Sequence, residues 1–346
     1  MNKQENKQPA GQQPMLSGPV SDMVKDTRYD AFLLVRTGEQ RVGSNGSRYV
    51  DMTLCDRTGD INAKLWDSAY SPPPAGSIVR VRGIVQEYHG RLQLRVERIR
   101  FATDADPVTL DSLVPCAPEP PEEMMAKVRA AVDTISREDL RTVVTRLLDD
   151  AGDTLLTFPA AAKLHHAERG GLLHHVTSML RMANHYADEY PELDRDLLIA
   201  GVVAHDLAKL VELNATPLGT VTDYTPDGQL IGHIVRGVTR IDAIGREVGC
   251  DPEILLMLEH MVLAHHGVPE YGSPRPPMFP EAEVLSNLDL LDARIFEMNA
   301  AIARVRPGGF SERLWSLDRR LYRRMNVPGQ TPSDDHDPDP DASAES

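Results

Sequence analysis

The residues best suited to chemistry in this chain are a histidine and an aspartate that stand side by side after an apolar run. His205 and Asp206 follow residues 198–204, which are all apolar or glycine. Successive residues of a helix sit about 100° apart, so adjacent histidine and aspartate side chains can lean into one cavity. A neutral imidazole and a carboxylate together suit a divalent metal such as Mn, Fe, Co or Zn. The pair therefore indicates a candidate metal site.

Further histidines and aspartates recur in similar apolar surroundings, on at least five helix-like segments. The candidate ligands are His175, His205, Asp206, His233, His265, His266 and Asp289. A helical bundle can bring residues from separate helices to one interior point. Any one of these histidines alone is compatible with a hydrogen-bonded core residue. A buried polar group without a partner costs about 1–3 kcal/mol, so several together favour a metal that satisfies them all.

The ligands require helices, and residues 123–328 are expected to form an all-α bundle. Apolar residues recur at helical spacing through residues 140–148. We expect Ser136 to cap the N-terminus of that helix. Asp251, followed by Pro252, predicts the start of another helix, because proline is favoured at the first helical position.

Residues 23–104 show the alternation of strands instead. Apolar residues alternate with basic or polar ones through residues 78–85 and 92–99, and a turn at 56–60 precedes the alternating segment 61–66. Five short strands in about 75 residues predict a small β-barrel, for which an OB-fold is the natural candidate. The predicted fold is thus a multidomain one, with a five-stranded OB-like barrel before a helical bundle.

The barrel segment is mildly basic within an acidic protein of net charge −15. Residues 28–103 hold 12 Lys and Arg against 8 Asp and Glu, whereas the remainder holds 25 against 44. This imbalance indicates a module that binds a polyanion, although sampling scatter explains it equally well. Residues 54–66 resemble the second and third strands of OB-fold nucleic-acid-binding domains, which present aromatic and basic side chains to single strands. The candidates for that role are Trp66, Tyr49, Tyr88, Arg48 and Arg82. In the alternative interpretation, the aromatic residues fill a small core and the arginines only aid solubility.

The remaining segments are expected to connect or flank these two domains. Residues 1–22 are rich in Gln, Pro and Gly and predict a disordered N-terminus, residues 105–122 form a proline-rich linker, and residues 329–346 form a disordered acidic tail. The cysteines lie far apart, which excludes a zinc knuckle and argues against a disulfide framework. Neither a signal peptide nor an apolar run of 18 residues is evident, so we expect a cytoplasmic protein without membrane attachment.

The order of the metal-ligand candidates is similar to the H…HD…D signature of the HD-domain phosphohydrolase superfamily. More closely, residues 160–295 resemble the YhaM-type 3′→5′ exoribonucleases, which join an N-terminal OB-fold to an HD domain. The phrases that carry this resemblance are His165-His166, Gly170-Gly171-Leu172-Leu173-His174-His175, Ala204-His205-Asp206-Leu207-Ala208-Lys209, Tyr224-Thr225, Gly228-Gln229-Leu230-Ile231-Gly232-His233, Glu270-Tyr271-Gly272-Ser273-Pro274 and Asp289-Leu290-Leu291-Asp292-Ala293.

The resemblance implies roles for the individual ligands. His175, His205, Asp206 and Asp289 would hold one metal, whereas His233, His265 and His266 look like the residues that hold a second metal in binuclear HD proteins. Asp206 would then bridge the two ions. Asp292 competes with Asp289 for the last ligand position, and we favour Asp289. The resemblance favours Mn²⁺, with Fe²⁺, Co²⁺ or Mg²⁺ as alternatives, in one or two copies.

The resemblance also implies the reaction, which is the removal of mononucleotides from the 3′ end of single-stranded RNA, with single-stranded DNA as a further substrate. Asp206 and Lys209 would be catalytic, with Lys209 contacting phosphate, and His166 and Arg275 are weaker candidates for substrate contact. It further suggests a homo-oligomer. Two alternatives remain: a phosphohydrolase of nucleotides or cyclic nucleotides, and a nucleic-acid-binding protein without catalysis. The cyclic-di-GMP branch carries Gly-Tyr-Pro after its paired histidines, whereas this chain has Gly-Val-Pro at residues 267–269.

Overall fold

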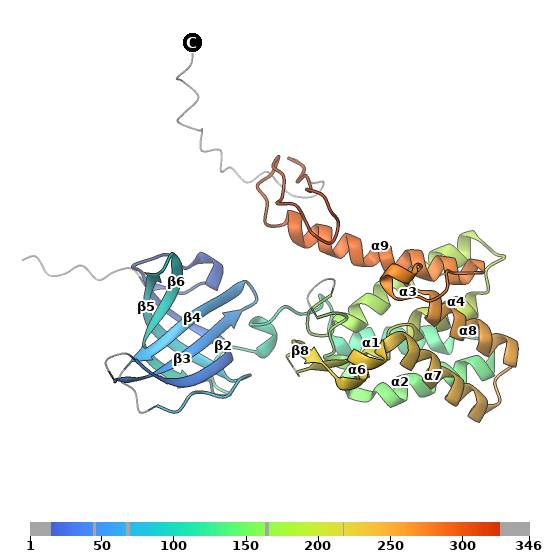
Figure 1. Cartoon of the computed structure of the whole chain (residues 1–346), viewed down its shortest axis with the longest axis horizontal. Helices are drawn as coiled ribbons and strands as arrows, with labels where there is room; N and C mark the ends of the chain where they lie inside the picture. Colours follow the sequence, from blue (N-terminus) through green and yellow to red (C-terminus); the bar gives the residue numbers. More distant parts are fainter. Residues whose placement is uncertain (1–14, 44–45, 67–69, 163–165, 217, 326–346) are drawn as a thin grey trace, which may run out of the picture.

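A computed structural model places a β-barrel and a helical body on either side of a short connecting segment (Figure 1). It describes residues 15–43, 46–66, 70–162, 166–216 and 218–325. The acidic tail predicted for 329–346, the first 14 residues of the predicted disordered N-terminus and His165 lie outside the described residues. Among the described residues, no helix is both long and apolar enough to cross a membrane.

The barrel is built from five long strands, as the alternation predicted. They are β2 (Arg28–Val42), β3 (Arg48–Asp56), β4 (Gly59–Trp66), β5 (Ile78–Tyr88) and β6 (Arg91–Phe101). The sheet order is β2-β3-β4-β6-β5, and β5 pairs back with β2, which closes the barrel. The alternating apolar side chains, among them Val50, Met52, Val81 and Leu94, fill its interior.

A glycine allows β5 to bend where its register shifts, between Arg82 and Gly83. A Cβ atom on Gly83 would lie 2.2 Å from the carbonyl oxygen of Arg95 on the neighbouring strand. Only glycine permits this close approach, so the β-bulge depends on that residue.

The N-terminal segment is more ordered than its composition predicted. Residues 15–16 form β1 (Met15–Leu16), which pairs in parallel with β2, and a 3₁₀ turn follows at Val20–Asp22. Val20 is buried in the barrel core, and its backbone N–H donates to Asp56 Oδ2 at 2.8 Å. The prediction of disorder is therefore wrong for residues 15–22, because one apolar residue and a distant carboxylate anchor a polar segment.

The proline-rich connection packs on the barrel before the helices begin. It contains a 3₁₀ turn at Leu110–Ser112, and the next two residues, Leu113 and Val114, are buried against Leu34 and Cys55. The helices are α1 (Pro121–Asp133), α2 (Glu138–Ala151), α3 (Gly171–Glu189), α4 (Arg195–Ala204), α5 (Lys209–Glu212), α6 (Pro226–Leu230), α7 (Gly232–Val248), α8 (Pro252–Ala264) and α9 (Pro280–Ile302).

Helix α4 lies at the centre of the helical body, which explains its apolar sequence. Every residue from Leu197 to Ala204 is buried, and α4 packs against α2, α3, α8 and α9. A Cβ atom on Gly201 would fall 2.3 Å from Met261 Cε on α8, so this glycine lets the two helices approach closely. Helix α4 thereby brings its C-terminal end into the interior of the bundle.

The helical region departs from an all-α bundle in two places. A hairpin of β7 (Leu213–Ala215) and β8 (Val221–Tyr224) interrupts the chain between α5 and α6. After α9, residues 303–325 form turns and isolated β-bridges, and no helix. Both segments contain residues that favour turns over a continued helix: the hairpin has Asn214 and Gly219, and the segment after α9 has Pro307, Gly308 and Gly309.

One of the two predicted helix caps is observed. Asp251 accepts a hydrogen bond from the backbone N–H of Glu253 at 2.9 Å, at the start of α8. Ser136 does not cap α2, whose N-cap position is Arg137. The Ser136 hydroxyl instead donates to Asp196, which belongs to α4.

Candidate metal centre and nucleic-acid interface

The candidate ligands converge from five helices on the end of α4. His205 and Asp206 directly follow α4, and the other ligands lie on or next to α3, α7, α8 and α9. All but one of the seven are buried: His175, His205, Asp206, His233, His265 and Asp289, with His266 partly buried. The structure therefore brings together every residue that the sequence predicted as a ligand.

One group of nitrogen and oxygen atoms surrounds Asp206 Oδ2. His205 Nε2 lies 3.4 Å from this oxygen and His175 Nε2 lies 3.9 Å from it, while the two Nε2 atoms are 3.3 Å apart. Asp289 Oδ1 lies 3.2 Å from His175 Nε2. This first triad of His175, His205 and Asp206 has its ligand atoms within 4.8 Å of one another.

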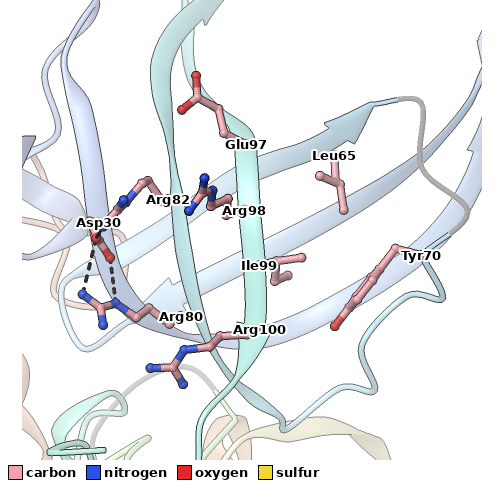
Figure 2. Close-up of a pocket in the computed structure, with 9 residues that line it drawn as sticks. All are labelled: Asp30, Leu65, Tyr70, Arg80, Arg82, Glu97, Arg98, Ile99 and Arg100. Carbon is pink, nitrogen blue, oxygen red and sulfur yellow. Dashed lines mark hydrogen bonds and ion pairs between the residues drawn. The ribbon is translucent and has the colours of Figure 1, made fainter.

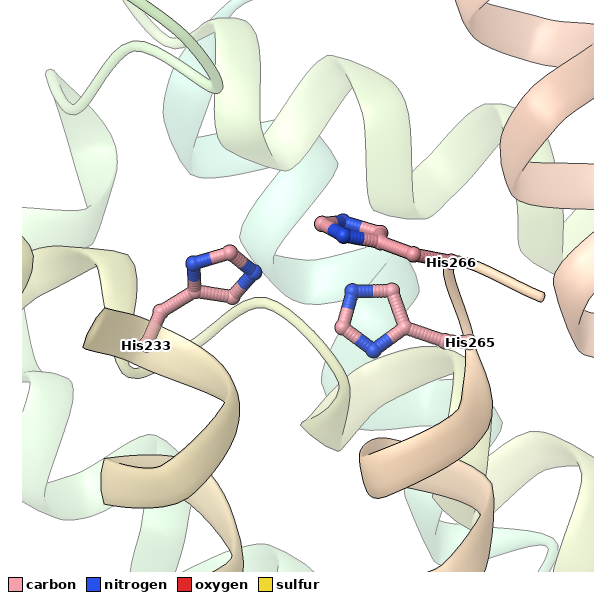
Figure 3. A group of neighbouring side chains, drawn as sticks. All are labelled: His233, His265 and His266. Atoms are coloured by element: carbon pink, nitrogen blue, oxygen red, sulfur yellow. The ribbon is translucent and has the colours of Figure 1, made fainter. Parts of the chain in front are cut away.

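A second group of ligand atoms faces the other oxygen of the same carboxylate. His233 Nε2 and His265 Nε2 lie 3.6 Å and 3.7 Å from Asp206 Oδ1. Figure 3 shows the three imidazoles of His233, His265 and His266 turned toward one another from α7 and the end of α8. Asp206 thus stands between the first triad and this histidine triad, with one oxygen toward each.

The Nδ1 atom of each of these four histidines forms a hydrogen bond that orients the ring. His205 Nδ1 bonds the carbonyl oxygen of Val202 at 2.9 Å, and His265 Nδ1 bonds that of Val262 at 2.7 Å. His266 Nδ1 bonds the carbonyl oxygen of Tyr271 at 2.6 Å, and His233 Nδ1 bonds Glu212 Oε1 at 3.0 Å. A proton on Nδ1 leaves the Nε2 lone pair free for a metal, which is the usual arrangement of histidine ligands.

Asp292 takes this supporting position for His175. Its Oδ2 atom lies 2.8 Å from His175 Nδ1, whereas Asp289 lies on the Nε2 side. The geometry therefore favours Asp289 over Asp292 as the ligand. Asp292 Oδ2 also lies 2.7 Å from His166 Nε2, and His166 is 2% exposed. A residue buried behind a ligand cannot touch substrate, so its position does not support the prediction of a substrate contact for His166.

Three buried polar atoms at this site have no hydrogen-bond partner within the described residues. They are Asp206 Oδ1, His233 Nε2 and His265 Nε2, which face one another across the second group. Each unsatisfied buried group costs free energy of folding. When the imidazoles are neutral with the proton on Nδ1, each of these three atoms carries a lone pair that a metal ion can accept. Such a set of nitrogen and oxygen atoms fits a divalent transition metal.

Burial favours the neutral imidazole at two residues of the histidine triad, His265 and His266. Burial, with smaller contributions from His266 and His205, lowers the pKa of His265 well below its usual value. Burial likewise lowers the pKa of His266. Both rings therefore stay unprotonated at neutral pH and keep a lone pair for a metal.

The first triad attracts positive charge instead. Burial opposes protonation of His175, but hydrogen bonds to Asp289 and Asp292 outweigh it and raise the pKa of His175 to about 9. Burial also opposes ionisation of Asp206, yet the charges of Lys209 and His205 hold the pKa of that carboxyl well below its usual value. Positive charge is thus stabilised between the carboxylates, whether it belongs to a proton or to a metal ion.

Lys209 is close to this centre, as the sequence predicted for a catalytic lysine. Its side chain is buried, and Nζ lies 2.6 Å from Asp206 Oδ2. Arg275, the other proposed substrate contact of this region, is exposed in the loop between α8 and α9. The same loop reaches the histidine triad through Ser273, whose hydroxyl accepts a hydrogen bond from the backbone N–H of His266 at 3.0 Å.

On the barrel, three of the aromatic and basic candidates gather into one aromatic patch. Tyr49 and Trp66 stack across β3 and β4, with ring centroids 4.6 Å apart. Lys64 Nζ lies 5.3 Å from the Tyr49 ring centroid and 5.6 Å from that of Tyr88. Trp66 and Tyr88 are 42% and 59% exposed, so they do not fill the core. Lys64 was missed from the sequence, although it is two residues before Trp66 and therefore on the same face of β4.

Arg48 is exposed beside Tyr49 at the start of β3, whereas Arg82 lies apart from the aromatic patch. Figure 2 shows Arg82 in a pocket with Arg80, Arg98 and Arg100, where Arg82 and Arg80 both turn toward Asp30. Arg82 Nε and Arg80 Nε each lie 2.9 Å from a carboxylate oxygen of Asp30. Arg82 therefore already has an anionic partner.

Comparisons with known proteins divide the chain in the same way. A family model described as an OB-fold nucleic acid binding domain matches residues 33–102. A model of the HD domain matches residues 172–294, which include every candidate metal ligand.

Whole-length relatives are also found. The chain is 42% identical over 299 residues to a protein of Bacillus licheniformis named 3'-5' exoribonuclease YhaM. The aligned residues make up 85% of this chain and 93% of the relative. The chain is 40% identical over 296 residues to the protein of the same name from Bacillus velezensis and 40% identical over 299 residues to that from Bacillus subtilis, with the same coverage.

Proposed function

This chain belongs to the family of YhaM-type 3′→5′ exoribonucleases, and from that premise we propose that it releases mononucleotides from the 3′ end of single-stranded RNA. The observation that carries the proposal is the convergence of the six other candidate ligand residues on the buried carboxylate of Asp206. Single-stranded DNA is a second substrate in this proposal, because stacking and charge on an OB-fold do not require a 2′-hydroxyl.

The HD domain implies a divalent metal, and the residues present fit it. We assign His175, His205, Asp206 and Asp289 to one ion, and His233, His265 and His266 to a second that shares Asp206. Mn²⁺ is our choice because the family resemblance favours it; imidazole and carboxylate ligands together also suit Fe²⁺ and Co²⁺. A bound divalent ion supplies Lewis acidity and lowers the pKa of water toward neutrality, which phosphodiester hydrolysis requires.

The residues of the chain then have separate tasks. Asp206 fixes the position of the two groups of ligands relative to each other, because each of its oxygens faces one group. Lys209 keeps a buried positive charge 2.6 Å from Asp206 Oδ2, where it offsets negative charge that develops on a phosphate during attack. Asp292 and Glu212 keep His175 and His233 oriented by bonding their Nδ1 atoms.

We assign to the barrel the task of holding the part of the RNA strand upstream of the 3′ end. Its aromatic patch of Tyr49, Trp66, Tyr88 and Lys64 offers ring faces and a positive charge, with which bases and phosphates can be held without sequence selection. We place the protein in the cytoplasm, because its three cysteines are free in the structure. We also expect a homo-oligomer, as the family resemblance suggests.

A digest of an end-labelled RNA tests the proposed reaction. With Mn²⁺ present, a 20-nucleotide single strand labelled at its 5′ end should shorten one nucleotide at a time, while a 3′ label should appear at once in mononucleotide. Early release of labelled mononucleotide from the 5′-labelled strand would show that degradation runs from 5′ to 3′ instead. Binding without any shortening would favour the non-catalytic alternative, and hydrolysis of free or cyclic nucleotides alone would favour the nucleotide phosphohydrolase.

Replacing Trp66 with alanine is expected to weaken binding of a 20-nucleotide strand about tenfold, because a stacked base contributes about 1–3 kcal/mol. Cleavage of a dinucleotide, which lacks the upstream nucleotides assigned to the barrel, should change less than twofold. Fluorescence anisotropy and dinucleotide turnover measure the two effects. Phe101→Ala, which removes an exposed aromatic residue of β6 outside the aromatic patch, is the matched control. Equal losses on both substrates would reject a gripping role for the barrel.

A further inference from the structure

The segment after α9 carries a concentration of positive charge that the metal centre and the barrel do not explain. Residues 303–325, here called the C-terminal element, hold seven arginines against one glutamate and one aspartate, in a chain of net charge −15. Figure 1 shows this element in red at the far end of α9, projecting away from the helical body. All buried residues of α9 lie within its first ten positions, 280–289.

The C-terminal element is folded and presents its arginines on a defined support. The backbone N–H of Arg323 donates to the carbonyl oxygen of Gly309 at 2.9 Å, and the N–H of Ser311 donates to that of Leu321 at 2.8 Å. Leu317 and Leu321 are buried within it. The backbone of the element is therefore held together by its own hydrogen bonds and its two buried leucines.

Two groups of arginines can be distinguished by their partners. Arg323 and Arg320 support the fold of the element, since they donate to the carbonyl oxygens of Val305 and Ser311 at 2.6 Å and 2.8 Å. Arg304, Arg306 and Arg324 are exposed, and their guanidinium groups make no hydrogen bond or ion pair with any residue that the structure describes. Three guanidinium groups are thus left for an anionic partner outside the chain.

Exposed aromatic rings lie among these arginines. Trp315 is 87% exposed, which makes it the most exposed large hydrophobic residue of the described chain, and Phe310 is 57% exposed. Phe310 and Tyr322 have ring centroids 5.1 Å apart, and the Arg320 guanidinium lies 5.5 Å from the Phe310 centroid. Interleaved arginine and aromatic side chains are the composition with which proteins bind single-stranded nucleic acid, through phosphate charge and base stacking.

We propose that the C-terminal element is a second contact surface for the RNA substrate, separate from the barrel. A second copy of this chain, with its acidic helical body, is the competing partner. RNA is favoured because it supplies phosphates for the arginines and base faces for the exposed rings beside them, whereas the charge of an acidic protein surface complements only the arginines. This inference rests on the proposed function. It adds that the affinity for longer RNA strands depends on both the barrel and the C-terminal element.

The length of α9 gives a scale for the substrate that reaches this surface. Asp289 lies in the metal centre and Ile302 ends the helix 13 residues later, which corresponds to about 20 Å at a rise of 1.5 Å per residue. A stacked strand advances about 3.4 Å per nucleotide, so about six nucleotides span that distance. Strands much shorter than this should not sense the C-terminal element.

The test neutralises the three unpartnered arginines in the full chain, as Arg304→Gln, Arg306→Gln and Arg324→Gln together. In EDTA, binding of a 20-nucleotide oligoadenylate should weaken about tenfold, and the slope of log affinity against log salt should fall by about 2, since each lost phosphate contact removes about 0.7. Binding of a trinucleotide should be unchanged. The matched control makes the same change in charge at Arg129, Arg146 and Arg246, which pair with acidic residues on the helical body.

The outcomes separate this inference from the proposed function. Equal binding by the variant and the control at both lengths overturns the inference, while wild-type release of mononucleotides still supports the function. Sedimentation that shows a changed oligomeric state in the variant, with RNA affinity intact, overturns it in favour of self-association. If the wild type releases no mononucleotide, the function fails, but the binding measurements in EDTA still decide whether the C-terminal element holds RNA.

Discussion

The Asp206→Asn variant is expected to lose at least about 10³-fold in mononucleotide release, with both groups of ligands affected at once. One oxygen of Asp206 faces His175 and His205, and the other faces His233 and His265. Asparagine has the same shape but offers a neutral oxygen on one side and an NH₂ donor on the other. Release of labelled mononucleotide from a 20-nucleotide RNA in Mn²⁺ measures the effect.

The fold of this variant needs its own control, because Asp206 is the ion-pair partner of Lys209. Leaving one member of a buried ion pair alone costs about 3–5 kcal/mol. A double variant, Asp206→Asn with Lys209→Met, removes both charges and should melt closer to the wild type while staying inactive. An Asp206→Asn protein that is folded by circular dichroism and degrades RNA at the wild-type rate would refute the central role of this carboxylate.

The His265→Ala variant is expected to lose one of two divalent ions and about 10²-fold in turnover. The Nε2 atom of His265 faces the second group, 3.7 Å from Asp206 Oδ1, and its Nδ1 atom forms a hydrogen bond with the carbonyl oxygen of Val262. The first group, with Asp289 and His175, should keep its ion. Elemental analysis of the dialysed protein together with turnover of a dinucleotide measures both effects.

His260 provides the matched control for that variant. It lies on α8, about one helical turn before His265. Its Nε2 atom accepts a hydrogen bond from the backbone N–H of Met278, and it contacts no candidate ligand through that atom. His260→Ala should therefore leave the metal content unchanged. Loss of one ion in both variants would mean that the effect comes from a disturbed α8 and not from a missing ligand.

Much of the ligand set could be predicted because four ligands, His175, His205, His265 and Asp289, lie in strongly apolar segments of the sequence. Burial of a histidine or aspartate next to residues 198–204 is unfavourable unless something satisfies it, and this is evident from sequence alone. The choice between Asp289 and Asp292 could not be settled in that way. The two residues are three positions apart on α9, and only the orientation of the His175 ring decides which one faces Nε2.

Other features depended on partners far away in the sequence. The Ser136 hydroxyl bonds Asp196, and a local capping pattern cannot anticipate an acceptor 60 residues later. His166 was proposed as a substrate contact from its place in a motif, but its bond to Asp292, 126 residues away, buries it. Arg82 alternates with apolar residues as an RNA-binding arginine would, yet the cross-strand carboxylate of Asp30 is its partner.

The metal content of the purified wild-type protein tests the central claim most directly. After incubation with Mn²⁺ and dialysis against metal-free buffer, elemental analysis should find two divalent ions per chain, and activity should disappear in EDTA and return with Mn²⁺. A folded protein that retains no divalent ion and degrades RNA equally well in EDTA would contradict the account.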